Sequence, residues 1–188
     1  TGLNKKYSVI IPGSGVNIEK FSFSRLPKSS PTIMMASRLL KDKGVHEFVS
    51  AAKIVKKINN KIKFVLVGTP DPENPSSISL EELNGWINAE YIEFWGHKTD
   101  MAKIISQSTI FVLPSYREGL PKVLIEASSC GRPIITTNVA GCGDAIINNK
   151  TGLLVEKCNE KDLADKIIAL SSDLKRCEEM GVFGRKLV

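Results

Sequence analysis

The chain has 188 residues, of which 26 are lysine or arginine and 20 are aspartate or glutamate, so its formal net charge is +6. Hydrophobic residues make up 42% and charged residues 24%, a composition that excludes a disordered chain and a fibrous repeat. A chain of this length suits one domain, which buries roughly 70% of its unfolded surface and needs no disulfide or metal for stability.

Short apolar runs alternate along the chain with segments of helical spacing. In chain order we expect a strand at 8–11, a polar connector at 21–31, a strand at 32–36, a helix at 45–58, a strand at 63–68, a proline-rich loop at 69–77, a helix at 80–88, a strand at 91–95, a helix at 101–107, a strand at 109–114, a helix at 121–130, a strand at 132–137, a turn with a short helix at 141–148, a strand at 152–156, and helices at 161–171 and 174–187. This alternation predicts an α/β fold, a Rossmann-like three-layer αβα sandwich with a mostly parallel sheet of about six strands.

Four features bear on location and partners. No apolar run approaches the roughly 20 residues of a membrane-spanning helix, and the opening residues do not resemble a signal peptide. The four cysteines form no CxxC pair, which favours free thiols in a cytoplasmic protein. A lysine cluster is interpreted as a solvated helix face rather than a nucleic-acid site, although a basic surface also attracts anionic donors and anionic membranes. The cluster comprises Lys53, Lys56, Lys57, Lys61 and Lys63.

Ligands of such folds sit at the carboxyl ends of the strands, so the residues that follow each strand are the candidates for a site. Arg38 and Lys43 follow the strand at 32–36 and precede a helix. Two cations at a helix N-terminus form a natural anion site, and the planar guanidinium holds phosphate oxygens in pairs. A solvated loop is the equally weighted alternative.

Two glutamates follow the strand at 109–114. Glu118 lies in the loop, and Glu126 lies in an otherwise apolar helix, where we expect its carboxylate to be hydrogen-bonded. Carboxylates accept hydrogen bonds from adjacent sugar hydroxyls, and Gly119 lets a ligand approach the backbone. The alternative for Glu118 is an acid that favours the helix dipole.

The other strand ends carry weaker signals. Residues 138–144 read as a glycine turn leading into a helix, with Asp144 as an acid at its start. His97 and His46 are interpreted as surface or supporting residues rather than catalysts. The chain has no metal-ligand spacing, no GxSxG elbow and no Walker A motif, and its Gly13-Ser14-Gly15 segment fails the dinucleotide pattern.

Together these motifs resemble a family. The chain resembles the C-terminal, donor-binding half of family 4 retaining glycosyltransferases (glycosyl transferases group 1), which have the two-domain GT-B architecture. The resemblance rests on an ordered set of segments: residues 11–21 entering the domain, Arg38 and Lys43 five residues apart, a Glu-x7-Glu signature at Glu118 and Glu126, and the segments 130–135, 141–144 and 151–155.

The resemblance implies a role for each matching residue. Arg38 and Lys43 would neutralise the donor diphosphate, and Glu118 would bind donor-sugar hydroxyls, which makes these three the expected catalytic residues. Glu126 would bind the ribose. Further donor contacts are implied at the Gly119 and Leu120 amides, at the helix start near Val123 and Leu124, and at the base beside Gly96 and His97. No metal and no cofactor are expected.

The resemblance further implies transfer of a sugar from a nucleotide-diphosphate sugar to a glycan or lipid-linked acceptor in bacterial surface polysaccharide synthesis. Among the nucleotides, the family favours UDP over GDP or ADP. We expect residues 1–188 to be one nucleotide-sugar-binding domain, with 1–31 as the entry segment and connector. The acceptor domain is absent, so this chain should bind donor but turn over little alone. We expect no nucleic-acid partner, and a cytoplasmic location, peripheral at the inner face of the membrane. The alternatives are a nucleotide-sugar 2-epimerase of the same architecture and a non-catalytic nucleotide-binding module.

Overall fold

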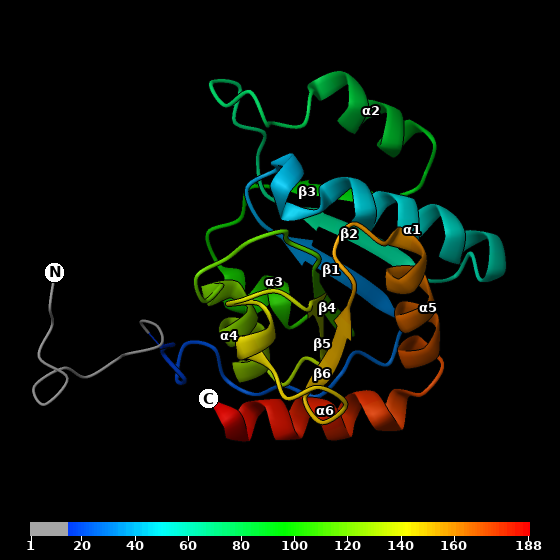
Figure 1. Cartoon of the computed structure of the whole chain (residues 1–188). Helices are drawn as coiled ribbons and strands as arrows, with labels where there is room; N and C mark the ends of the chain where they lie inside the picture. The colour runs from blue at the N-terminus through cyan, green and yellow to red at the C-terminus, as the bar shows by residue number, and fades with distance from the viewer. Residues whose placement is uncertain (1–14) are drawn as a thin grey trace, which may run out of the picture.

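The computed structural model describes residues 15–188 as a parallel sheet covered by helices (Figure 1). The strands are β1 (Thr32–Ala36), β2 (Lys63–Val67), β3 (Glu93–Gly96), β4 (Ile110–Leu113), β5 (Ile134–Thr137) and β6 (Gly152–Val155), and the α-helices are α1 (Val45–Ile58), α2 (Leu80–Asn88), α3 (Met101–Ile105), α4 (Lys122–Ser129), α5 (Glu160–Ser171) and α6 (Leu174–Leu187). Two short 3₁₀ helices cover Lys41–Lys43 and Gly143–Ala145. The strand expected at 8–11 lies outside the described residues.

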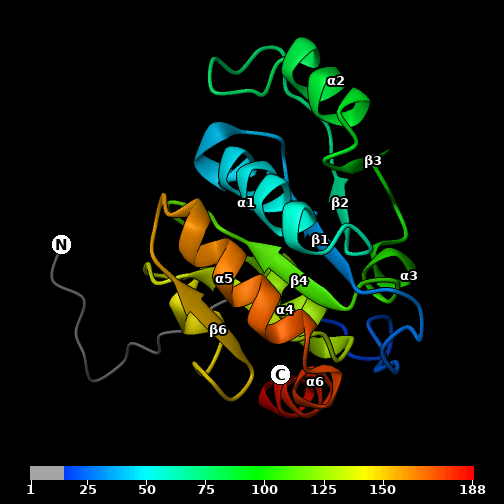
Figure 2. The same cartoon turned by 90° about the vertical axis from the view of Figure 1, so that its right-hand side faces the viewer.

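The predicted α/β sandwich is confirmed. The sheet has the order β3-β2-β1-β4-β5-β6, and every pair of neighbouring strands is parallel. Helices α1 and α5 lie side by side on one face, and α3 and α4 cover the other (Figures 1 and 2). Because both faces are covered, β1 and β4 are buried along their whole length, as their continuous apolar sequences require.

The strand order places a switch point between β1 and β4. From β1 the chain proceeds to β2 and β3 on one side, and from β4 to β5 and β6 on the other. The loops that follow these two neighbouring strands therefore diverge to opposite faces and leave a crevice between them, which is where open α/β sheets bind ligands.

Several element boundaries differ from the sequence-based expectation. The strand expected at 91–95 begins at Glu93, because the Tyr91 N–H still donates to the carbonyl of Trp86 in the turn that closes α2. The strand expected from 132 begins at Ile134, because the Arg132 N–H bonds back to Ala127. The helix expected to reach 107 ends at Ile105 in a tight turn.

The connector at 21–31 is fastened to the domain. Phe21 is buried, and its carbonyl accepts hydrogen bonds from the Ser129 hydroxyl, at 2.7 Å, and from the Arg185 guanidinium, at 2.9 Å. These contacts join the connector to the end of α4 and to α6, so the connector packs as part of the domain rather than as a loose linker.

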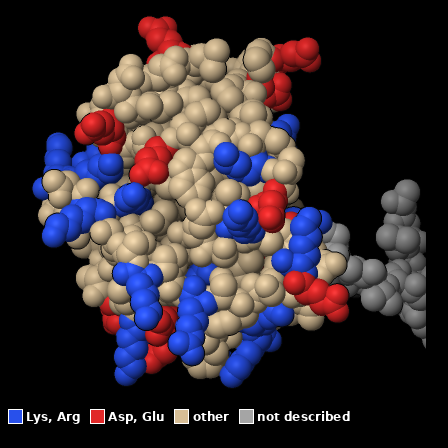
Figure 3. All heavy atoms as spheres, turned by 180° about the vertical axis from the view of Figure 1, so that it is seen from behind, with Lys and Arg blue, Asp and Glu red and all other residues tan. Residues whose placement is uncertain are grey.

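The predicted free thiols are confirmed. Cys130, Cys142 and Cys177 are buried and Cys158 is exposed, and none is in a disulfide. Between residues 15 and 188, no helix combines the length and apolarity needed to cross a membrane. On the face seen in Figure 3, lysine and arginine side chains are spread over the middle and lower parts, with acidic side chains among them.

Candidate functional site

A pocket of about 360 Å³ lies at the carboxyl ends of β1, β2 and β3, against the start of α4. It is lined by Ala36, Ser37, Arg38, Val67, Gly68, Thr69, His97, Lys98, Met101, Val123 and Glu126. A cavity of about 420 Å³ lies elsewhere, beside the start of α6, and its mixed lining includes Lys150, Asp173 and Arg176. Of these two, the first adjoins the carboxyl ends of strands, where the fold places ligands.

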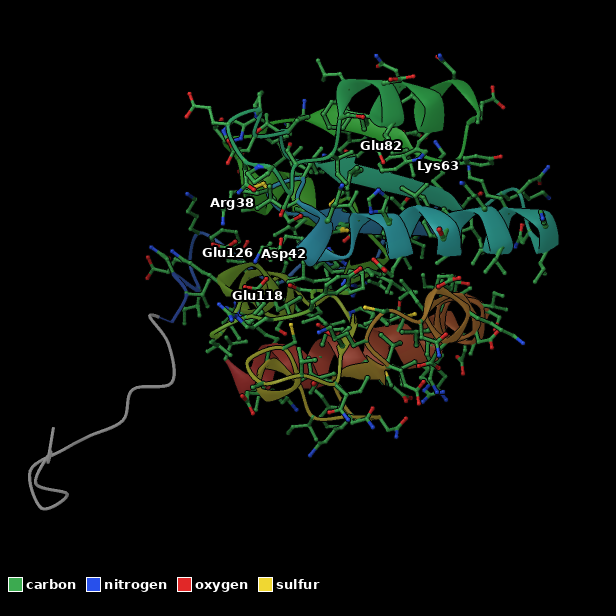
Figure 4. All side chains as sticks on the ribbon, turned by 45° about the horizontal axis from the view of Figure 1, so that its top comes forward. Arg38, Asp42, Lys63, Glu82, Glu118 and Glu126 are labelled. Atoms are coloured by element: carbon green, nitrogen blue, oxygen red, sulfur yellow. The ribbon has the colours of Figure 1, made fainter. Side chains whose placement is uncertain are left out.

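The pocket brings together four of the predicted site residues from three separate segments of the chain. Arg38 follows β1, His97 follows β3, and Val123 and Glu126 belong to α4. Figure 4 shows Arg38 and Glu126 at the same edge of the molecule, with Asp42 and Glu118 close by, whereas Lys63 and Glu82 lie apart from them. Arg38 is exposed, and within residues 15–188 its guanidinium makes no hydrogen bond or ion pair. It is therefore free to bind an anion.

Glu126 differs from the expectation that its carboxylate is hydrogen-bonded. No side chain or backbone group of the described residues bonds it, because the carboxylate opens into the pocket. Burial raises its pKa, and the charges of Lys122 and Lys20 act in the opposite direction. A desolvated acceptor that faces a pocket is available for a ligand's hydroxyl groups.

Replacing Glu126 by glutamine should separate binding from stability. Because the folded state raises the pKa of Glu126, the charged form costs stability at neutral pH and that cost is relieved as pH falls through the raised value. We therefore expect Glu126→Gln to have an equal or higher thermal midpoint, and to bind UDP at least about tenfold more weakly if the carboxylate holds the ribose. Calorimetric titration and thermal melting would test this, with Glu81→Gln on exposed α2 as the control. A lower midpoint with unchanged affinity would assign Glu126 a purely structural role.

Lys43 and Glu118 lie beside the pocket and bind each other. The Lys43 Nζ is 2.7 Å from the Glu118 Oε1, and the two side chains are only 15% and 16% exposed. The lysine predicted to bind the phosphates and the glutamate predicted to bind the sugar hydroxyls thus form an ion pair between the loops that follow β1 and β4.

Two further hydrogen bonds join the same two loops, and a third joins the loop after β4 to helix α1. The Asp42 carbonyl accepts from the Tyr116 N–H at 2.8 Å and from the Ser115 hydroxyl at 3.1 Å. The Tyr116 hydroxyl donates to the Glu47 Oε1 at 2.6 Å, and burial together with this acceptor raises the pKa of Tyr116. This role of Tyr116 was not predicted from the sequence, where its only signal is its place in the loop that follows a strand.

The remaining predicted residues of α4 and its preceding loop, and Gly96, are not among those that line the pocket. Gly96 has a φ of +67°, and an added side chain at Gly96 or Gly119 would meet open space. Leu120 lines a separate apolar hollow of about 230 Å³. Leu124 is fully buried and its N–H already donates to the Pro121 carbonyl, so neither its side chain nor its amide faces a ligand. No side chain caps the start of α4.

His46 supports the fold, as expected. Its Nε2 lies 3.0 Å from the Glu82 Oε1, and its ring contacts Trp86 edge to face. The hydrogen bond from His46 is the largest cause that lowers the pKa of Glu82 to about 2. His97 is exposed on the pocket wall.

Comparison with known proteins yields consistent matches. A family model described as glycosyl transferases group 1 matches residues 16–187. The chain is 36% identical over 188 residues to N,N'-diacetylbacillosaminyl-diphospho-undecaprenol alpha-1,3-N-acetylgalactosaminyltransferase of Campylobacter jejuni, covering 93% of this chain and 48% of that protein. It is 32% identical over 184 residues to the capsular polysaccharide biosynthesis glycosyltransferase CapM of Staphylococcus aureus, with coverage of 93% and 48%. The chain thus spans about half the length of these curated relatives.

Solved structures match as well. The crystallised C-terminal domain of LpcC, a glycosyl transferase group 1 family protein of Francisella tularensis, has a TM-score of 0.79 at 25% identity, covering 93% of this chain and 96% of that one. A variant of TarM from S. aureus, crystallised with fondaparinux, alpha-GlcNAc-glycerol and UDP, has a TM-score of 0.77 at 25% identity, with coverage of 92% and 34%.

Proposed function

The chain belongs to the glycosyl transferases group 1 family. We therefore propose that it is the donor-binding part of a glycosyltransferase and binds a nucleotide-diphosphate sugar at the pocket lined by Arg38 and Glu126. The observation that carries this proposal is one pocket that presents the Arg38 guanidinium and the Glu126 carboxylate, neither of which has a hydrogen-bond or ion-pair partner among residues 15–188. A cation suits the diphosphate and a carboxylate suits the ribose hydroxyls. The epimerase alternative is not favoured, since the matched relatives are glycosyltransferases.

The proposed chemistry follows from where charge develops. The bond between the anomeric carbon and the β-phosphate oxygen breaks, and the departing diphosphate gains negative charge that Arg38, Lys43 and the uncapped start of α4 stabilise. The acceptor hydroxyl attacks from the same face, forms the new glycosidic bond and gives its proton to a phosphate oxygen. In this scheme Glu118 and Glu126 bind hydroxyls, and neither acts as a nucleophile.

The finer assignments are also proposals. UDP as the nucleotide is supported by the UDP in the TarM crystal. A glycan or lipid-linked acceptor is supported by the undecaprenol-linked and capsular names of the relatives. We further propose that the acceptor is bound by a part outside this chain, at the cytoplasmic face of a membrane. We propose that cationic side chains, rather than a metal, neutralise the diphosphate.

Calorimetric titration of this chain with UDP, GDP and ADP, with and without magnesium, tests the proposal. We expect saturable, magnesium-independent binding of UDP that falls at least about thirtyfold in Arg38→Ala, because a charge-assisted bidentate contact to phosphate is lost. Lys41→Ala removes an exposed cation from the neighbouring 3₁₀ helix and should leave the affinity within about twofold, since a solvent-exposed charge is screened. Absence of binding to all three nucleotides, or equal losses in both variants, would contradict the proposed site.

A further inference from the structure

The two residues proposed to hold different parts of the donor are paired with each other in the free protein. The Lys43 Nζ and the Glu118 Oε1 are 2.7 Å apart, at ion-pair distance. Among residues 15–188 neither side chain has a second ion-pair partner. Arg38, by contrast, has no ion-pair partner in that part of the chain. Of the two cations proposed to bind the diphosphate, Arg38 is therefore not neutralised by any described residue before the donor binds, whereas Lys43 is neutralised by Glu118.

The backbone around the ion pair leaves only the side chains free to rearrange. The Tyr116 N–H and the Ser115 hydroxyl both donate to the carbonyl of Asp42, which immediately precedes Lys43. Tyr116 and Ser115 lie two and three residues before Glu118. On the other side, an added Cβ at Gly141 would lie 1.7 Å from the Gly119 carbonyl oxygen, so the Glu118 loop is also packed against that turn. The loops cannot separate without breaking these contacts, but a rotation of the lysine side chain can break the ion pair.

We propose that the Lys43–Glu118 ion pair is exchanged on donor binding: the diphosphate takes Lys43, and the released Glu118 carboxylate becomes the acceptor for sugar hydroxyls. This inference rests on the proposed function of the site. A nucleotide diphosphate that breaks the pair leaves Glu118 without its cation, whereas an intact donor supplies hydroxyl groups to it. The pair thereby couples the diphosphate and sugar subsites, and favours the complete donor over the free nucleotide product.

The exchange predicts an unusual result for the sugar-free nucleotide. Glu118→Gln removes the anion that holds Lys43, so UDP no longer has to displace it. We expect this variant to bind UDP about tenfold more tightly than the unaltered chain does. A roughly tenfold change in affinity lies between the effect of losing an exposed ion pair and that of losing a fully buried one. Lys43→Ala should bind UDP more weakly, and in the Lys43→Ala background the Glu118→Gln change should have no effect.

Titration of UDP into the unaltered chain, the two single variants and the double variant completes a thermodynamic cycle. Asp42→Asn is the matched control, because it removes one negative charge next to Lys43 without releasing the lysine, and it should change the affinity by less than about twofold. Thermal melting of each variant checks folding, and Arg38→Ala shows whether UDP occupies the proposed pocket.

Three outcomes would overturn the exchange while leaving the proposed function intact: UDP binding that depends on Arg38 but is not tightened by Glu118→Gln, equal tightening with and without Lys43, or equal tightening by Asp42→Asn. The second and third would show simple charge repulsion. Loss of the Arg38 dependence would instead contradict the proposed function itself.

Discussion

Gly141→Ala is expected to destabilise the domain by about 3–4 kcal/mol, and to weaken binding of the proposed UDP-sugar donor at least about tenfold in the molecules that remain folded. Gly141 has a φ of +79°, which L side chains rarely adopt, and its added Cβ would lie 1.7 Å from the Gly119 carbonyl oxygen and 2.5 Å from that of Glu118. Because both neighbours are backbone atoms, no side-chain rotation relieves the clash. The loop that carries Glu118 would have to move.

Gly143 provides the matched control in the same turn. An alanine Cβ there would meet its nearest atom, the Asn138 Oδ1, at 3.7 Å, which is ordinary contact. Gly143→Ala should therefore change the free energy of unfolding by less than about 1 kcal/mol. Urea denaturation followed by calorimetric titration measures both effects. Equal stability of the two variants would show that the turn does not support the Glu118 loop.

Arg132 is the basis of the second large effect. This residue is completely buried, and its Nη2 donates to the Ser24 hydroxyl and to the Ser106 carbonyl, the latter at 3.1 Å. Its Nε and Nη1 have no hydrogen-bond partner, and no carboxylate pairs with it, within the part of the chain that the structure describes. Burial lowers the pKa of Arg132 to about 10. The protein thus retains a desolvated charge to hold the connector.

Arg132→Ala should destabilise the domain by about 3–4 kcal/mol, because it leaves a cavity and releases the connector. Arg132→Met fills the space without a charge, and should cost less than about 1 kcal/mol or even stabilise. The lowered pKa means that the unfolded chain binds more protons near pH 10, so the unaltered protein should gain stability relative to Arg132→Met as pH rises through 10. Urea denaturation between pH 7 and pH 11 measures these differences, and equal losses in both variants would show that the hydrogen bonds, not volume and charge, dominate.

The element types were predictable because their signals are local. Buried parallel strands are continuous apolar runs, as in β1, and α1 carries its buried residues at helical spacing. The boundaries were less predictable, because they depend on which carbonyl a single N–H finds. The N–H groups of Tyr91 and Arg132 donate to carbonyls in the preceding helical turns. No pattern of residue types distinguishes such a bond from the first hydrogen bond between two strands.

Proximity within the site was partly predictable. A parallel sheet brings the ends of its strands to one edge, so placing Arg38 and Glu126 there required only the order of the elements. The orientation of each group was not predictable. Leu124 belongs to the same helix as Val123, yet it faces the core while Val123 faces the pocket, and Glu126, expected to be hydrogen-bonded, has no such partner among the described residues.

The pattern of residues along the chain was thus sufficient for the fold class, the free cysteines, the ordered motifs of the family and the edge of the sheet at which the pocket lies. The Lys43–Glu118 ion pair, the Tyr116–Glu47 hydrogen bond and the buried Arg132 required three-dimensional coordinates. The physical reason is that burial and pairing depend on which distant segments meet: Lys43 and Glu118 are 75 positions apart, and only the packing of the loops after β1 and β4 makes the two charges neighbours.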